Sequence, residues 1–198
     1  MTDANDLPAA ARRARMRARA LAAREAATVE QRLGWEKAIE GHLDSLIETL
    51  APRSLAFCWP YRSEADLRGW VARWLAADAR RIAALPVVVT RDAPLIFRRW
   101  LPGSALAPDR HGIPCPVHGE ALTPELILVP LNAFDARGYR LGYGGGYFDR
   151  TLATIRPLTV GIGFELGREA DVLPQSHDRA LDWLVTEAGV RRQMAEDK

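Results

Sequence analysis

Cysteine is scarce in this 198-residue sequence, and long apolar runs are missing. The two cysteines, Cys58 and Cys115, belong to no CxxC pattern, so a disulfide framework or a zinc site has little support. The four histidines form no metal-spaced pair, which argues against zinc catalysis. Two reduced thiols are typical of a cytoplasmic protein, and we expect that location.

No apolar run reaches the length of a membrane span, so we expect no membrane association. The first 27 residues are rich in Arg and Ala and lack the continuous apolar segment of a secretory signal. A transit peptide is one interpretation of this composition. A helix that belongs to the fold is the interpretation that we favour.

Lysine is almost absent. Of the 27 basic residues only Lys37 and Lys198 are lysines, the other 25 are arginines, and the net charge is +2. This near-neutral balance argues against a general nucleic-acid binder. Any phosphate that the protein holds is therefore expected to be bound by guanidinium groups and backbone N–H groups.

Helical and strand-like segments alternate along most of the chain. Apolar spacing predicts two N-terminal helices over about 9–50, with a break near Thr28, where Gln31 completes a capping pattern. A further helix is predicted over 64–77, and residues 102–124, rich in Gly and Pro, are predicted to be irregular. Strand-like runs occupy residues 54–59, 82–90, 94–100, 125–131, 158–164 and 181–186.

This alternation predicts a single domain over 1–198 with a three-layer αβα, Rossmann-like fold. Its mainly parallel sheet is expected to be covered by helices on both faces, with the N-terminal helices packed on the sheet. Ligands of such folds bind beyond the carboxyl ends of the strands. Three segments are predicted to follow a strand and turn sharply, and they span residues 59–64, 130–135 and 174–178. We expect a monomer and leave an oligomer open.

The most unusual segment is RLGYGGGYFDR at residues 140–150, followed by a helix predicted to begin near Gly145 or Gly146. Its spacing matches neither the dinucleotide fingerprint nor the P-loop. From the glycines alone, a tight structural turn and a phosphate cradle at a helix N-terminus are about equally supported. Arg140 and Arg150 flank the loop and could supply positive charge.

Two acids could hold Mg²⁺ near such a phosphate site. Asp149, one turn into the predicted helix, is either a metal ligand or an acid favoured by the helix dipole. Asp178 is either a second oxygen ligand or a helix cap. Arg13, Arg17 and Arg24 form either a solvated basic face or a helix that reaches nucleotide phosphates. No Ser, Cys or Lys has a recognisable nucleophile setting, which fits a reaction whose reactive groups come from the nucleotide and the substrate.

The segment LILVPLNAFDARGYRLGYGGGYFDRTL resembles the signature of the 5-formyltetrahydrofolate cyclo-ligase family, also called 5,10-methenyltetrahydrofolate synthetases. WPYRSEAD, LIFRRW, HGIPCP and LPQSHDRALDWLVTE follow in the order typical of that family, so the likeness covers nearly the whole chain. The N-terminal helix resembles the family's K-x-x-L-R motif, with Arg13, Met16 and Arg17 at the Lys, Leu and Arg positions.

The resemblance implies an ATP- and Mg²⁺-dependent ring closure of 5-formyltetrahydrofolate, with or without a polyglutamate tail, to 5,10-methenyltetrahydrofolate. The formyl oxygen would attack the γ-phosphate, N10 would attack the activated carbon, and ADP and phosphate would be released. Arg140 and Tyr147 are the implied catalytic residues, and Asp149 and Asp178 are the implied Mg²⁺ ligands. The implied ATP contacts are Arg13, Arg17, Arg140, Leu141, Gly142, Tyr143, Gly144, Gly145, Gly146, Tyr147 and Phe148. The implied folate contacts are Trp59, Glu64, Tyr143, Gly144, Gly145, Gly146 and Tyr147.

Two other functions remain as alternatives. The first is an ATP-dependent ligase or kinase that acts on a different small acid, which binding of 5-formyltetrahydrofolate would distinguish. The second is a non-enzymatic nucleic-acid binder that uses the arginine-rich helix and exposed aromatic residues. The near-neutral net charge argues against this second alternative.

Overall fold

The structure is a computed structural model that describes residues 7–193. Residues 1–6 and 194–198, the ends of the predicted 1–198 domain, lie outside the described part. The elements in chain order are α1 (Ala9–Ala26), α2 (Val29–Leu50), β1 (Ser54–Ala56), α3 (Arg68–Ala76), β2 (Ile82–Val87), β3 (Ile96–Trp100), β4 (Leu106–Pro108), β5 (Pro114–Pro116), β6 (Ala121–Leu122), β7 (Leu126–Pro130), β8 (Ala133–Phe134), β9 (Arg140–Leu141), α4 (Tyr147–Thr154), β10 (Leu158–Ile162), the 3-10 helix η1 (Glu165–Gly167), β11 (Trp183–Thr186) and β12 (Gly189–Arg192).

Eight strands form one mixed sheet in the order β12-β11-β10-β7-β1-β2-β3-β6. The five strands from β11 to β2 run parallel, whereas β12, β3 and β6 pair antiparallel at the two edges. Strand β7, in the centre, is apolar along its length and buried through its first four residues, as expected for a parallel strand covered on both faces. The predicted α/β fold is confirmed, with antiparallel strands added only at the edges.

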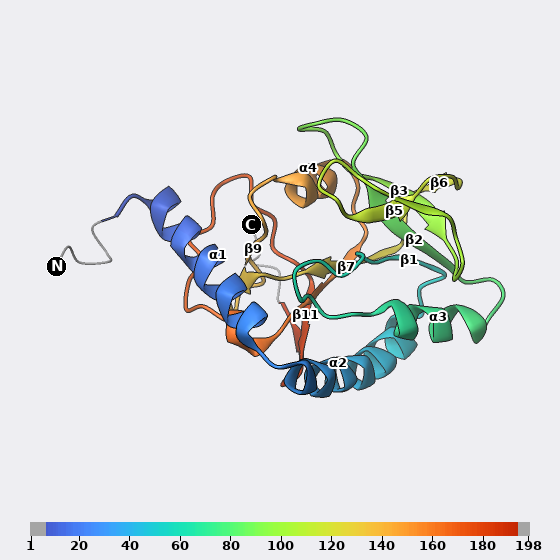
Figure 1. The fold of residues 1–198 in the computed structure, drawn as a ribbon, viewed down its shortest axis with the longest axis horizontal. Helices are drawn as coiled ribbons and strands as arrows, with labels where there is room; N and C mark the ends of the chain where they lie inside the picture. The colour runs from blue at the N-terminus through green and yellow to red at the C-terminus, as the bar shows by residue number, and fades with distance from the viewer. Residues whose placement is uncertain (1–6, 194–198) are drawn as a thin grey trace.

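Helices cover both faces of the sheet, which gives the predicted three layers. Figure 1 shows α2 and α3 below the strands and α4 above them. Two apolar clusters fill the two spaces between the layers. One joins α2 and α3 to the sheet, and the other packs Phe148, Leu152 and Ile155 of the α4 region against the opposite face.

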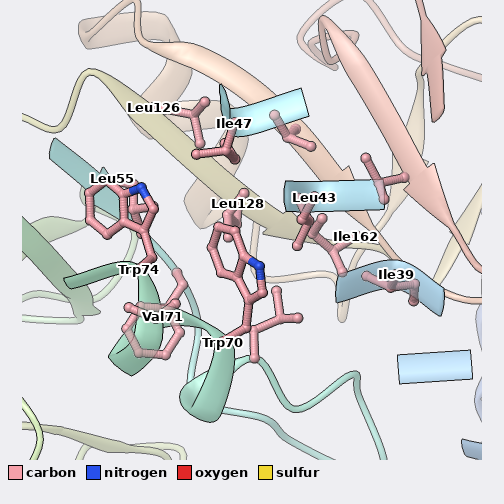
Figure 2. Packing of buried hydrophobic residues seen from close by; sticks show 14 of the residues in the cluster. Ile39, Leu43, Ile47, Leu55, Trp70, Val71, Trp74, Leu126, Leu128 and Ile162 are labelled. Atoms are coloured by element: carbon pink, nitrogen blue, oxygen red, sulfur yellow. The ribbon is translucent and has the colours of Figure 1, made fainter. Parts of the chain in front are cut away.

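The larger cluster follows the helical spacing that the sequence shows. Ile39, Leu43 and Ile47 project from α2 at intervals of four residues. They belong to one cluster with Trp70 and Trp74 of α3 and with strand residues of the sheet (Figure 2). The indole nitrogen of Trp70, a fully buried side chain, donates a hydrogen bond of 2.7 Å to Asp44. This pairing satisfies the polar atom of a side chain that otherwise contributes apolar area.

The predicted break between the N-terminal helices is confirmed at Thr28. Its hydroxyl accepts from the Gln31 backbone N–H and its own N–H donates to the Gln31 side chain, which forms a complete capping box. Helix α2 packs on the sheet as predicted. Helix α1 differs, because it contacts β8 and η1 and so crosses the carboxyl ends of β7 and β10. It is mostly Ala and Arg, and its buried residues are Arg13, Ala20 and Arg24, so it has no large apolar face to cover a sheet.

Several segments differ from the sequence prediction. Residues 102–124, predicted irregular, contain the β4–β5 ribbon and β6, because prolines are tolerated at the ends of short edge strands. The ribbon β8–β9 and the edge strand β12 were also not predicted. Residues 174–178 do not follow a strand directly, since they lie between η1 and β11. Within residues 7–193, no helix has the length and apolar character needed to cross a bilayer.

Candidate active site

A cavity of about 820 Å³ opens at the carboxyl ends of β1, β2 and β7. This volume is in the range of pockets that bind small molecules, which is about 300–1,000 Å³. Its walls come from α1, the loop after β1, the loop between β4 and β5, the glycine-rich loop before α4, and the loop between η1 and β11. The cavity therefore lies where ligands are expected in a parallel sheet.

The predicted site residues meet in this one cavity, apart from Leu141. The lining includes Trp59, Glu64, Arg13, Arg17, Arg140, Gly142, Tyr143, Gly144, Gly145, Gly146, Tyr147, Phe148, Asp149 and Asp178. Leu141 is fully buried in a small cluster with Ala20, Ala133 and Val172 instead. Its side chain anchors the start of the glycine-rich loop against α1 and does not reach the cavity.

The glycine-rich loop ends at the N-terminus of α4, as predicted. Gly146 is the N-cap residue with φ of 64°, and Gly144 has φ of 93°. Residues with a Cβ rarely adopt these φ values, so glycine is favoured at both positions where the loop enters the helix. Arg140 lines the cavity, whereas the Arg150 guanidinium donates to the Gly145 carbonyl at 2.6 Å. Arg150 thus holds the loop and its charge is not directed at the cavity.

Arg140 is buried and is paired with Asp149. Its Nη2 atom lies 3.1 Å from Asp149 Oδ1, and its Nη1 atom donates to the backbone carbonyl of Arg179 at 3.0 Å. The Arg179 backbone N–H lies 3.4 Å from the same Asp149 oxygen. Asp149 Oδ2 accepts no hydrogen bond from the described residues, so one carboxylate oxygen is left for a ligand.

A second buried ion pair links α1 to the loop that carries Asp178. Arg13 Nη1 and Nη2 lie 2.5 and 3.2 Å from the two oxygens of Asp178, and Arg13 also donates to the Leu173 carbonyl. Burial acts to raise the pKa of Asp178, but the hydrogen bonds from Arg13 and from the Gln175 N–H outweigh it, so the pKa is lowered. Asp178 is therefore a carboxylate at neutral pH.

Arg17 lies beside this pair and has no polar partner for its Nε atom among the described residues. Burial, and next the neighbouring charge of Arg13, lower the pKa of Arg17. Two arginines on one side of the cavity, one of them without a counter-ion, give a local excess of positive charge. Such an arrangement favours an anionic ligand.

Glu64, which also lines the cavity, is held by two hydrogen bonds. Tyr143 donates its hydroxyl to Glu64 Oε1 at 2.8 Å, and the Tyr61 backbone N–H donates to Oε2 at 3.1 Å. Arg24 donates to the same Tyr143 hydroxyl at 2.6 Å. Burial raises the pKa of Glu64, and the charge of Arg24 partly opposes this effect. Each oxygen of Glu64 keeps one further lone-pair direction for a ligand N–H group.

Two predicted aromatic contacts also lie on the cavity wall. Trp59 has the Arg68 guanidinium stacked over its ring at 4.6 Å. The Tyr147 ring lies edge-on to the His111 ring, with centroids 5.7 Å apart, and the Tyr147 hydroxyl is 3.3 Å from His111 Nε2. These rings offer apolar surfaces on which a flat heterocycle could pack.

The acidic residues fit a metal that is bound together with phosphate. Within residues 7–193, no three His, Cys, Asp or Glu side chains gather as a metal site. Mg²⁺ is commonly held by only one or two carboxylates plus substrate phosphates and water. Asp149 and Asp178, which line the same cavity, supply such a donor set.

Sequence reasoning missed some of the lining and supporting residues. Asp109, His111 and Ile113 come from the loop between β4 and β5, which the sequence analysis assigned to an irregular region. Arg24 was considered for phosphate binding, but all three of its guanidinium nitrogens are occupied by protein acceptors and it does not line the cavity. Its position in the series of arginines on α1 was a signal, although only the fold identifies its partners.

Comparison with known proteins identifies the family of this chain. The family model described as the 5-formyltetrahydrofolate cyclo-ligase family matches residues 9–187. A 5-formyltetrahydrofolate cyclo-ligase of Mycolicibacterium smegmatis is 32% identical over 170 residues, which cover 78% of this chain and 83% of that protein. The protein of the same name from Haemophilus influenzae is 28% identical over 153 residues, which cover 72% of this chain and 79% of that protein.

Solved structures agree. The structure of 5,10-methenyltetrahydrofolate synthetase from Aquifex aeolicus superimposes with a TM-score of 0.81 at 29% identity, covering 94% of this chain and 95% of that one. The synthetase from Mycoplasma pneumoniae, at 21% identity and a TM-score of 0.72, covers 88% of this chain and 98% of that one and supports the fold alone. With the family model matching nearly its whole length, this chain belongs to the 5-formyltetrahydrofolate cyclo-ligase family.

Proposed function

We propose that this protein converts 5-formyltetrahydrofolate to 5,10-methenyltetrahydrofolate with the conversion of ATP to ADP and phosphate. One observation carries the proposal in a chain of this family. A single cavity joins an acceptor carboxylate, Glu64, to a cationic wall and a glycine-rich loop at the N-terminus of α4. The reaction requires both a folate and a nucleotide. The wall with the Glu64 carboxylate suits the folate, and the wall with the arginines and the glycine-rich loop suits the nucleotide.

The folate is assigned to the wall formed by Glu64, Trp59 and Tyr147. A buried pterin ring needs acceptors for its N–H groups, and the free lone pairs of the Glu64 carboxylate can accept two of them. Trp59 and Tyr147 are proposed to pack against the flat rings of the substrate. Tyr143 and the loop glycines Gly144, Gly145 and Gly146 are proposed to contact the folate where it approaches the nucleotide.

The nucleotide is assigned to Arg13, Arg17, Arg140 and the loop from Gly142 to Phe148, without Leu141, which is buried away from the cavity. Unpaired backbone N–H groups at the start of α4 suit phosphate oxygens, and the arginines suit them through paired N–H groups. Arg13 and Arg140 are both occupied by carboxylates of Asp178 and Asp149 in this structure. We propose that phosphate replaces these carboxylates on the arginines, which frees both acids.

Mg²⁺ is proposed to bind the freed carboxylates of Asp149 and Asp178. When bound, the metal neutralises charge on the phosphate oxygens. Asp149 already has one oxygen without a hydrogen bond from the described residues, so it is the better preformed of the two ligands. The donor set matches the preference of Mg²⁺ for carboxylate oxygen shared with phosphate.

The proposed chemistry uses no protein nucleophile. The formyl oxygen of the folate attacks the γ-phosphorus and ADP departs. N10 then attacks the activated carbon, loses its proton, and phosphate leaves with the former formyl oxygen. Arg140 and Tyr147 are proposed to stabilise and orient the reacting groups, because phosphoryl transfer depends mainly on positioning and charge neutralisation.

The direct test is the absorbance of methenyltetrahydrofolate formed by the purified protein, with and without ATP and Mg²⁺. We expect product only when both are present. Binding of ATP without binding of 5-formyltetrahydrofolate in isothermal titration would instead support an ATP-dependent enzyme of a different small acid. Salt-sensitive RNA binding without turnover would support the nucleic-acid alternative.

The compartment and the oligomeric state of the protein are also proposed. Cys58 and Cys115 are both free thiols, which supports a reducing, cytoplasmic compartment. The protein is proposed to act as a monomer. Gel filtration at the assay concentration tests the oligomeric state, and a stable dimer would contradict the proposed monomer.

A further inference from the structure

Arg24 is a buried arginine that contacts no carboxylate directly among residues 7–193. Its side chain lies at the last turn of α1, and only 3% of the residue is exposed. Its Nε atom donates to the Arg62 carbonyl at 2.9 Å, its Nη2 atom to the Tyr143 hydroxyl at 2.6 Å, and its Nη1 atom lies 3.5 Å from the Leu131 carbonyl. Burying such a charge costs free energy unless a nearby opposite charge stabilises it.

The opposite charge is Glu64, reached through a single tyrosine hydroxyl. Tyr143 accepts from Arg24 and donates its own proton to Glu64 Oε1 at 2.8 Å. Burial and the neighbouring Glu64 charge raise the pKa of the Tyr143 phenol, so it keeps this proton at neutral pH. The order Arg24, Tyr143, Glu64 is therefore a directed chain of hydrogen bonds that ends on the carboxylate at the cavity wall.

This chain ties together three segments that are distant in sequence. Arg24 belongs to α1, Glu64 to the loop after β1, and Tyr143 to the glycine-rich loop, where Gly142 and Gly144 flank it. Flanking glycines leave the backbone free to move, so the hydrogen bonds of Tyr143 fix the position of this part of the loop. The Tyr143 ring also packs edge-on against Tyr61, with centroids 5.5 Å apart.

We propose that Arg24 is a positioning residue for folate binding, which acts through the Tyr143 hydroxyl to hold the Glu64 carboxylate in place at the cavity wall. This inference rests on the proposed function, because Glu64 is assigned there to the pterin. It gives the C-terminal turn of α1 a role at the folate wall, whereas Arg13 and Arg17, nearer the start of the same helix, face the nucleotide wall.

The test compares Arg24→Gln with Arg15→Gln, the same change at an exposed position of the same helix. Arg24→Gln should raise the KM and the Kd for 5-formyltetrahydrofolate about tenfold or more, because one charge-assisted link is lost. The KM for ATP should change less than about twofold. Arg15→Gln should leave both KM values unchanged. Arg24→Lys, which restores the charge without the planar fork, should recover part of the folate affinity.

Tyr143→Phe provides an independent variant, since Tyr143 is 45% exposed and its loss of a hydroxyl leaves the fold intact. It should also raise the folate KM selectively. The double variant of Arg24→Gln and Tyr143→Phe should have a folate KM no higher than that of the more impaired single variant, because both changes break the same chain of hydrogen bonds. The proposal would be overturned if the increases in folate KM of the two single variants multiplied in the double variant, or if the KM for ATP rose as much as the KM for folate. If Arg24→Gln fails to fold, an unchanged folate KM in Tyr143→Phe would overturn it.

The wild-type protein separates this inference from the proposed function. If the wild-type protein forms no methenyltetrahydrofolate, the proposed function is wrong. If the wild-type protein is active and Arg24→Gln binds 5-formyltetrahydrofolate as tightly as wild type in titrations without ATP, only the role of Arg24 is refuted.

Discussion

Replacing Glu64 by Gln should separate folate affinity from stability, and the two effects should have opposite signs. Glu64 accepts from the Tyr143 hydroxyl at Oε1 and from the Tyr61 N–H at Oε2. The carbonyl oxygen of Gln can keep the bond from the Tyr61 N–H, and its NH₂ group can donate to the Tyr143 hydroxyl, whose own proton has the Tyr61 carbonyl at 3.5 Å as another acceptor. The neutral amide mainly loses the charge. It also replaces one acceptor oxygen with an NH₂ donor, which faces the pterin N–H groups that the carboxylate is proposed to accept.

The loss of folate affinity follows from these contacts. One charge-assisted hydrogen bond is removed, and a buried donor is left opposite another donor, for a combined cost of about 3 kcal/mol. That cost corresponds to roughly a hundredfold increase in the KM for 5-formyltetrahydrofolate. ATP meets a different wall of the cavity, so its KM should stay within about twofold.

Stability should change in the other direction. Burial raises the pKa of Glu64 above its ordinary value of 4.5, so the folded state favours the protonated carboxyl. Its contribution to stability is complete below the unfolded pKa and is lost as the pH rises through the folded pKa. Gln resembles the protonated form at every pH. Glu64→Gln should therefore be more stable than wild type at neutral pH and equal to it in acid.

Initial rates with each substrate varied in turn measure the two KM values, and thermal melts at neutral and acid pH measure stability. Each kcal/mol corresponds to about 2–4 °C in melting temperature for a chain of this size. Glu48→Gln, at an exposed position of α2, is the matched control and should change neither quantity. Equal increases in both KM values, or a lower melting temperature at neutral pH, would refute the assignment of Glu64 as a buried folate acceptor.

Three further predictions concern the metal and the scaffold. Asp149→Asn should lower kcat about a hundredfold, because a charge at the proposed phosphate site is lost; an unchanged kcat would contradict the metal role. It should also cost about 1–3 kcal/mol of stability, since Asn keeps an acceptor oxygen for Arg140 but not the negative charge that pairs with this buried guanidinium. EDTA should abolish turnover, and added Mg²⁺ should restore it, while the melting temperature of the nucleotide-free protein stays constant; a large drop would indicate a resident structural metal. Thr28→Ala should remove the capping box and cost about 1 kcal/mol in denaturant unfolding with kcat unchanged, and an unaltered midpoint would argue against it.

The locally encoded features were predictable. The capping box at Thr28, the buried strand β7 and the start of α4 beside Gly146 each depend on residues within a few positions of one another. Short edge strands were missed because their sequences resemble loops. The ribbon β4–β5 contains three prolines and pairs only three residues on each strand, so its apolar pattern is too short to detect.

The sequence by itself determined the element order, the glycine-rich loop and the family resemblance, because these depend on neighbouring residues and on motif spacing. The tertiary structure decided which charges meet. Arg13 pairs with Asp178 across 165 positions, and Arg24 contacts Tyr143 across 119. An arginine on a helix has no partner that spacing can identify, since its hydrogen-bond acceptors are brought to it only when strands and loops assemble. The different partners of Arg13 and Arg24 on the same helix are therefore a property of the fold.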